Sequence, residues 1–162
     1  MFVLCVIKTL LNFDIMDKLV PEKVRFIVVH CTDTRADESI DVETVRWWHK
    51  HRGFEDIGYH YLIRPSGFIE VGRPLEFKGS HAVGHNQFSV GVAYVGGRDN
   101  YNRLADTRTF EQKIALQYCF LDIVKYYPIE QIVGHNDISV KFCPCFNAKL
   151  EYKDFLSNLK KY

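Results

Sequence analysis

The run VRFIVVH, from Val24 to His30, constrains the fold more than any other part of the sequence. It is rich in β-branched and aromatic residues, with charged residues before it and the polar stretch CTDTRADES after it. A short apolar run with such boundaries is typical of a strand buried on both faces of a sheet. The sequence therefore predicts a central strand that carries His30 at its carboxyl end.

Helical patterns follow in two places. Apolar residues recur at helical spacing from Asp41 to Arg52, with a capping candidate in Ser39 or Asp41 and Gly53 just past the end. This pattern predicts an amphipathic helix. A longer helix is predicted from the T-x-x-Q capping box that begins at Thr109 to the helix-breaking Pro128.

Further strands are predicted between and after these helices. The segments Tyr59–Ile63 and Phe68–Val71 flank the turn sequence Pro-Ser-Gly, which predicts a hairpin. The run SVGVAYVGG predicts another strand that ends at its glycines. A short last strand is expected at Ile129–Val133 and a final helix from about Ala148.

The chain length and the order of these elements define the fold class. A chain of 162 residues has room for one domain with a sizeable core. Strands and helices that interleave with one hairpin predict an α/β fold, a single domain with a central mixed β-sheet of about five strands flanked by about three helices.

The candidate chemistry lies in the loop after the last strand. His135 is followed eight positions later by Cys143, and imidazole and thiolate are both good zinc ligands. A histidine and a cysteine on one loop often occur by chance, so a third ligand is needed. His30 is the obvious candidate because it also ends a buried strand. Three protein ligands with an open position describe a catalytic zinc site.

Four segments together resemble the zinc amidases, a family that includes the phage lysozyme-type N-acetylmuramoyl-L-alanine amidases and the peptidoglycan recognition proteins. They occur in the family's order and spacing, from about Arg25 to Phe155. The segments are FIVVHCTDT, WWHKHRGFEDIGYHYLIRPSG, GSHAVGHNQFSVGVAYVGG and VGHNDISVKFCPCF. The resemblance implies hydrolysis of the amide between N-acetylmuramic acid and L-alanine in peptidoglycan, in cell-wall lysis of the endolysin kind.

The resemblance also implies roles for individual residues. Its zinc ligands are His30, His135 and Cys143, and its catalytic side chains are Tyr59 and Lys141. A lysine beside the zinc can stabilise a developing oxyanion, and a tyrosine can hold or deprotonate the attacking water. Strand alternation would place Tyr59 and Tyr61 on one face of the hairpin and His60 on the other.

Other residues have structural or less certain roles. His81 and Asn86 lie where the loop of the family's members lines the substrate groove. Two roles are open for them: contact with the substrate, or a purely structural role in that loop. We expect structural roles for the histidines and tryptophans outside the zinc motif and burial as small apolar residues for Cys31 and Cys119. The first group comprises Trp47, Trp48, His49, His51 and His60, with the two tryptophans as core and boundary residues of a helix rather than sugar-stacking platforms.

Two alternatives to a zinc amidase stay open from the residues. A non-catalytic peptidoglycan-binding module of the same fold is disfavoured because the whole ligand set is present. A cysteine hydrolase would use Cys31 or Cys143 with a histidine. Cys145 departs from the family pattern and could compete for zinc or add a fourth ligand, which would close the site. The eight-residue offset from His135 favours Cys143 as the ligand.

The remaining expectations concern boundaries, location and partners. Residues 1–15 are apolar, but Lys8 and Asp14 interrupt the run, no small-residue cleavage site follows, and a membrane span would need more residues. We therefore expect an N-terminal extension at residues 1–23 and the peptidoglycan amidase domain at residues 24–162. The net charge of +1 gives no nucleic-acid footprint. We expect a monomer that stays in the cytoplasm until released to the cell wall, with secretion by an atypical leader as the alternative.

Overall fold

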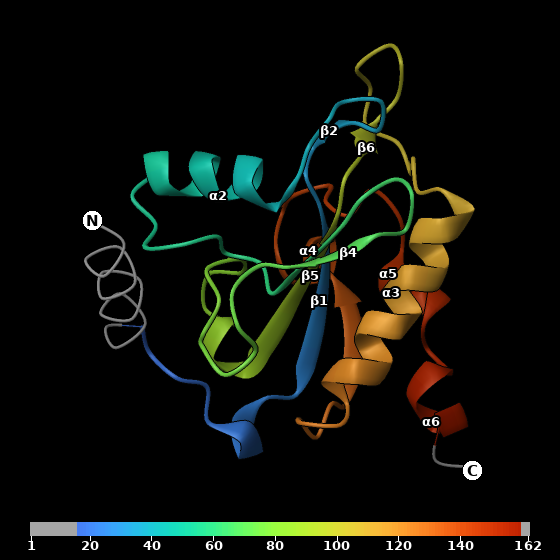
Figure 1. Ribbon diagram of the computed structural model, residues 1–162. Helices are drawn as coiled ribbons and strands as arrows, with labels where there is room; N and C mark the ends of the chain where they lie inside the picture. Colours follow the sequence, from blue (N-terminus) through green and yellow to red (C-terminus); the bar gives the residue numbers. More distant parts are fainter. Residues whose placement is uncertain (1–15, 160–162) are drawn as a thin grey trace.

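A five-stranded mixed sheet forms the middle of the computed structural model, which describes residues 16–159 (Figure 1). Across the sheet the strands are β4 (Ile69–Val71), β3 (Tyr61–Ile63), β5 (Ser89–Tyr94), β1 (Phe26–Cys31) and β7 (Gln131–Gly134). Only the pair of β3 and β4 is antiparallel. The predicted α/β domain with a mixed sheet is confirmed.

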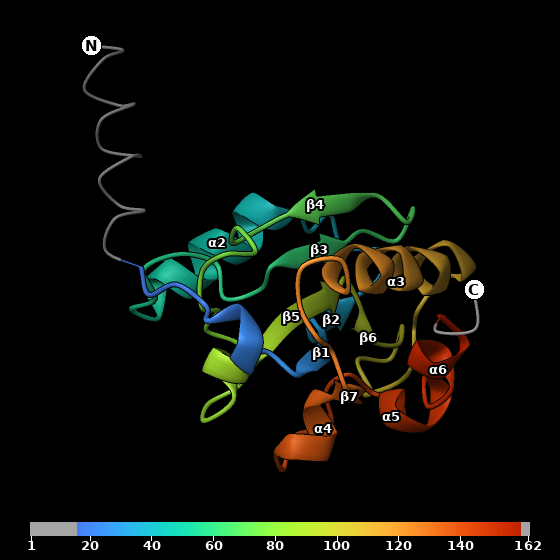
Figure 2. The ribbon, with the colours of Figure 1, turned by 90° about the horizontal axis from the view of Figure 1, so that it is seen from below.

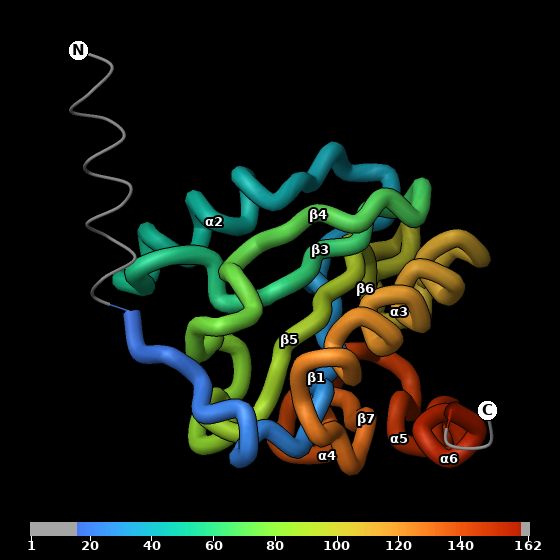
Figure 3. Tube along the Cα trace, turned by 60° about the horizontal axis from the view of Figure 1, so that its bottom comes forward, coloured from blue at the N-terminus to red at the C-terminus, as the bar shows by residue number. Residues whose placement is uncertain are grey.

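The predicted central strand is β1, which pairs in parallel with β5 on one side and β7 on the other. Every residue of β1 after Phe26 is buried, as a strand covered on both faces requires. Residues far apart in the sequence therefore lie side by side, with the blue β1 next to the orange β7 in Figure 3. The strand begins two residues later than predicted and includes Cys31.

Two helices cover opposite faces of the sheet (Figure 2). The helix α2 (Val42–His51) is capped by Asp41, whose carboxylate accepts from the N–H of Thr44 at 2.7 Å. The helix α3 (Phe110–Ile123) begins with the predicted capping box of Thr109 and Gln112. It ends earlier than the Pro128 boundary, because the residues after Ile123 form turns.

The remaining elements are short. They are η1 (Pro21–Lys23), β2 (Thr34–Arg35), η2 (Asn86–Phe88), β6 (Gly97–Arg98), α4 (His135–Ile138), α5 (Ala148–Glu151) and α6 (Phe155–Leu159). The predicted final helix is thus two short helices, and α4 forms where a loop was expected. These pieces bring the helices of the described residues above the predicted number.

The hairpin of β3 and β4 is present, but one inference drawn from it is wrong. The strand begins at Tyr61, so regular alternation does not extend back to Tyr59. The hydroxyl of Tyr61 donates to Asp122 of α3 at 2.6 Å, whereas Tyr59 packs against the apolar cluster beside α2. The two tyrosines therefore lie on different sides of the sheet.

The N-terminal lead-in packs on the domain from Met16 onward. Met16 and Leu19 are buried, and the N–H of Leu19 donates to the carbonyl of Glu76 at 2.8 Å. The predicted leader-like run of residues 1–15 lies outside the described residues. Within residues 16–159, no helix is long and apolar enough to cross a membrane.

The buried His60 ties this edge of the sheet together. Its Nδ1 accepts from the N–H of Gly91 in β5 at 3.0 Å, and its Nε2 donates to the carbonyl of Phe77 at 2.9 Å. Both ring nitrogens are thus satisfied in the neutral form. Burial lowers the pKa of His60 to about 4.

This burial predicts an acid-sensitive stability. Because the pKa is lower in the folded protein than the usual value of about 6.5, the unfolded chain takes up the proton first as the pH falls. The contribution of neutral His60 to the free energy of unfolding is complete above about pH 6.5. It is lost progressively towards about pH 4, by roughly 3 kcal/mol in all. Urea unfolding of the chelator-treated protein at pH 7 and pH 5 measures this loss.

The matched variants are His60→Gln and His51→Gln, since His51 is exposed at the end of α2. We expect the loss between the two pH values to shrink in His60→Gln and to stay at the wild-type size in His51→Gln. Equal losses in wild type and His60→Gln would contradict the assignment.

Candidate functional site

A cleft of about 1190 Å³ opens at the carboxyl ends of β1 and β7. On β1, Ile27, Val29 and Cys31 belong to the apolar cluster under α3, so strand alternation turns His30 to the other face. The wall of the cleft is built from α2, from the loop at residues 80–86 and from the loop after α4. Parallel strands end at one edge of a sheet, which is where such sites form.

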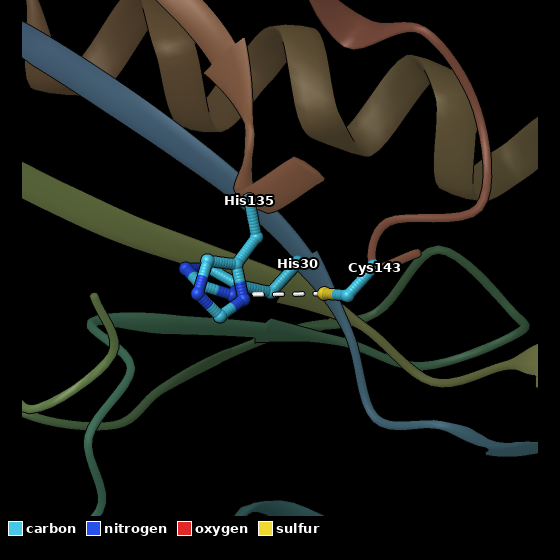
Figure 4. Close-up of side chains that lie close together, drawn as sticks. All are labelled: His30, His135 and Cys143. Atoms are coloured by element: carbon cyan, nitrogen blue, oxygen red, sulfur yellow. Dashed lines mark hydrogen bonds between the residues drawn. The ribbon is translucent and has the colours of Figure 1, made fainter. Parts of the chain in front are cut away.

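The structure brings His30, His135 and Cys143 together (Figure 4). His135 and Cys143 line the cleft, and His30 is fully buried beside them. His30 lies near the end of β1, His135 directly follows β7, and Cys143 returns on the loop after α4. One potential ligand atom from each of the three lies within 4.8 Å of the others. Nδ1 of His30 is 3.7 Å from Sγ of Cys143, so this nitrogen is the one that faces the sulfur.

The surroundings suit these three side chains to metal binding. Burial, followed by the charges of His81, His135 and Lys141, holds the pKa of His30 well below its usual value. Burial and the Lys141 charge also lower the pKa of His135. Both imidazoles are therefore neutral near pH 7, the form that binds a metal ion. The N–H of Cys31 donates to Sγ of Cys143 at 3.2 Å and fixes the position of the sulfur.

His81 lies directly behind His30. Its Nδ1 is 3.0 Å from Nε2 of His30, and only 8% of the residue is exposed. Because Nδ1 of His30 faces Cys143, its Nε2–H is the donor of this hydrogen bond. Such a contact fixes the tautomer and orientation of a ligand histidine. The sequence did not predict this contact with His30, because the motif GSHA indicates only that His81 lies in a loop.

Asn86 organises the same loop. Its side-chain oxygen accepts from the N–H of His81 at 2.9 Å and from the N–H of Ala82 at 2.8 Å. Both His81 and Asn86 border the cleft. Nδ1 of His81 and the side-chain oxygen of Asn86, however, already make hydrogen bonds within the protein. Substrate contact by the two residues stays a prediction.

The two predicted catalytic side chains also border the cleft. The ring centroid of Tyr59 is 5.1 Å from that of His30. Burial and the nearby Cys143 raise the pKa of Tyr59, so its hydroxyl stays protonated and can donate a hydrogen bond. Lys141 is exposed on the loop that carries Cys143, and its charge acts on both His30 and His135.

Cys145 does not join the ligand group. Its Sγ lies 3.9 Å from Sγ of Cys31 and 3.4 Å from the carbonyl oxygen of Gly97. The group with ligand atoms in mutual reach contains Cys143 instead. Cys31 and Cys119 are buried, as expected.

The expectation for Trp47 is wrong, because 59% of this residue is exposed and it borders the cleft. It lies on the solvent-facing side of α2, where an aromatic residue was expected to be covered. Phe142, 72% exposed, is another exposed aromatic residue at the cleft. His49 does have a structural role, since its Nδ1 accepts from the N–H of Gly58 at 2.8 Å.

Comparison with known proteins identifies the family. The profile described as N-acetylmuramoyl-L-alanine amidase matches residues 20–146. The chain belongs to the N-acetylmuramoyl-L-alanine amidase family. The predicted family and the predicted enzyme class are thereby confirmed.

Individual amidase relatives agree with the profile. The chain is 40% identical over 121 residues to the endolysin of Enterobacteria phage K11, which covers 75% of this chain and 80% of that one. It is 35% identical over 123 residues to the endolysin of Escherichia phage T7, covering 76% and 82%. Among solved structures, the N-acetylmuramoyl-L-alanine amidase LysC from Clostridium intestinale URNW has a TM-score of 0.71 at 30% identity, covering 85% of this chain and 87% of that one.

Proposed function

We propose that this amidase depends on zinc and cleaves the amide between N-acetylmuramic acid and L-alanine, in cell-wall lysis. The observation that carries the proposal is the group of His30, His135 and Cys143, in which His135 and Cys143 line an open cleft. Two neutral imidazoles and a thiolate are a donor set that suits zinc, and three protein ligands leave a position open. The endolysin relatives support the lytic role.

Zinc, when bound, supplies a Lewis acid that polarises a carbonyl and lowers the pKa of water. The residues that would hold the ion are His30 through Nδ1, His135 through a ring nitrogen and Cys143 through Sγ. His81 acts as a positioning residue, because its hydrogen bond keeps the Nε2–H tautomer of His30 and leaves Nδ1 free.

Tyr59 and Lys141 act on the reacting atoms. The protonated hydroxyl of Tyr59 beside His30 holds the attacking water by a hydrogen bond. The ammonium group of Lys141 stabilises the negative charge that develops on the carbonyl oxygen of the scissile amide. Trp47 and Phe142 give the cleft an apolar border against which the sugar and lactyl groups of the substrate can pack.

Product analysis tests the bond that is cleaved. Digestion of purified peptidoglycan should release free amino groups of L-alanine and no new reducing sugar ends, because glycan cleavage needs a pair of carboxylates. Mass spectrometry of the products with and without chelator is the measurement. Chelator should stop the reaction and added zinc should restore it.

Each rival function predicts a different result. A cysteine hydrolase would keep its activity in chelator and lose it to a thiol-alkylating reagent. A non-catalytic binding module would retain peptidoglycan without releasing amino groups. Reducing ends as the main product would overturn the amidase assignment.

Metal analysis tests the ligand set. We expect about one zinc per chain in protein purified without chelator. Cys143→Ser should lose most of this zinc after dialysis, because a serine hydroxyl is a poor zinc ligand at neutral pH. Cys145→Ser is the matched control and should keep it. The reverse pattern would assign the ligand role to Cys145.

Two variants separate catalysis from metal binding. Lys141→Ala should lose on the order of 10²–10³ in turnover, as removal of one oxyanion donor does elsewhere. Tyr59→Phe keeps the ring and deletes the hydroxyl, so its turnover should also fall. Zinc content and thermal unfolding should stay near wild type in both. Near-normal turnover would show that these residues are not catalytic, and joint loss of zinc and turnover would make them supports of the site.

A further inference from the structure

A pair of thiols, outside the group of His30, His135 and Cys143, flanks that group. Cys31 directly follows His30, and Cys145 lies two residues after Cys143. Their sulfur atoms are 3.9 Å apart, although the residues are 114 positions apart in the chain. Gly97 leaves room for both, because a methyl group there would lie 2.6 Å from Sγ of Cys31 and 3.6 Å from Sγ of Cys145.

We propose that Cys31 and Cys145 form a site of oxidation by small-molecule disulfides. The resulting internal disulfide joins the loop of Cys143 to the end of β1 and consumes no metal ligand. The assignment of Cys143 as the metal ligand rests on the proposed function. The disulfide between Cys31 and Cys145 does not depend on that function.

The two thiols are placed for sequential exchange. Cys145 is half-buried and borders the cleft, so an oxidant reaches it first, whereas only 4% of Cys31 is exposed. The Cys145 thiolate attacks one sulfur of the oxidant and releases the first thiol. The Cys31 thiolate then attacks Sγ of the mixed disulfide at Cys145 and releases the second. Two cysteine thiols are oxidised, one disulfide is reduced, and the two protons end on the released thiols.

Formation of the bond requires a small movement. A disulfide needs the sulfur atoms about 2.05 Å apart, so side-chain rotation must close the remaining gap. The backbone of Cys145 is held in a turn, with φ of 69° and its N–H bonded to the carbonyl of Phe142 at 2.7 Å. That turn keeps Sγ of Cys145 beside Cys31 in the folded protein.

The other two described cysteines, Cys143 and Cys119, are not placed to join this disulfide. Sγ of Cys143 faces Nδ1 of His30 at 3.7 Å and receives the N–H of Cys31. In the zinc-loaded protein this sulfur would be a ligand of the ion. Cys119 is 2% exposed in the core under α3 and is out of reach of the cleft.

The cross-link should stabilise the folded protein, because it closes a loop of more than one hundred residues in the unfolded chain. For a chain of this length the thermal unfolding midpoint should rise by on the order of 10 °C. Reductant should reverse the rise. The same shift should be absent from any variant that lacks either cysteine.

The experiment incubates the zinc-loaded full-length protein with oxidised glutathione, blocks free thiols and maps tryptic peptides by mass spectrometry. Cys31 falls in FIVVHCTDTR, and Cys143 and Cys145 share FCPCFNAK. Because one peptide holds two cysteines, Cys145→Ser is the deciding variant. Cys119→Ser is the matched control, with its cysteine in IALQYCFLDIVK.

We expect the two peptides to be cross-linked in wild type and in Cys119→Ser, and separate in Cys31→Ser and Cys145→Ser. Zinc in the oxidised wild type should stay near its level in the reduced protein. A cross-link that persists in Cys145→Ser, release of zinc on oxidation, or free thiols at both positions after prolonged incubation would overturn the proposal. Failure of the zinc amidase assignment would be seen separately: the reduced protein would contain no zinc, or it would leave peptidoglycan uncleaved.

Discussion

The parallel pairing of β1 with β7 is the interaction on which the site depends. Its register places Val29 opposite Gly134. His30, the next residue of β1, and His135, which directly follows β7, therefore meet at one edge of the sheet. The loop after α4 then returns Cys143 to the same point, where the N–H of Cys31 donates a hydrogen bond to its sulfur. A shift of this register would separate the two histidines and turn their side chains to other faces.

Burial of His30 and His81 removes their hydration but keeps both imidazoles neutral. Placing imidazoles in an apolar setting disfavours their charged forms, which keeps His30 and His81 neutral near pH 7. The hydrogen bond between them compensates part of the lost hydration and fixes the nitrogen of His30 that faces Cys143. The side chains of the site are therefore oriented by contacts within the protein itself.

Local patterns in the sequence predicted much of this arrangement. The run before His30, the two capping signals and the hairpin turn each act within a few residues, so β1, α2, α3 and β3 with β4 could be inferred. The ligand candidates followed from strand ends and spacing. The contact of His81 with His30 and that of Cys145 with Cys31 depend on packing between distant segments, which no local pattern specifies. The errors at Tyr59 and Trp47 have the same origin, because each required the exact start of a strand or the uncovered side of a helix.

The order of the strands also determines when the protein becomes active during its synthesis. The central strand β1 is made early, but its partner β7 and the residues His135 and Cys143 come near the end of the chain. A nascent chain that has reached only β5 contains His30 but not His135 or Cys143, and it lacks the loop that carries Lys141. No partly translated form can therefore assemble the cleft, and the ribosome must release nearly the whole domain before hydrolysis can begin. A cell that makes a wall-degrading enzyme of this design is exposed only to finished molecules.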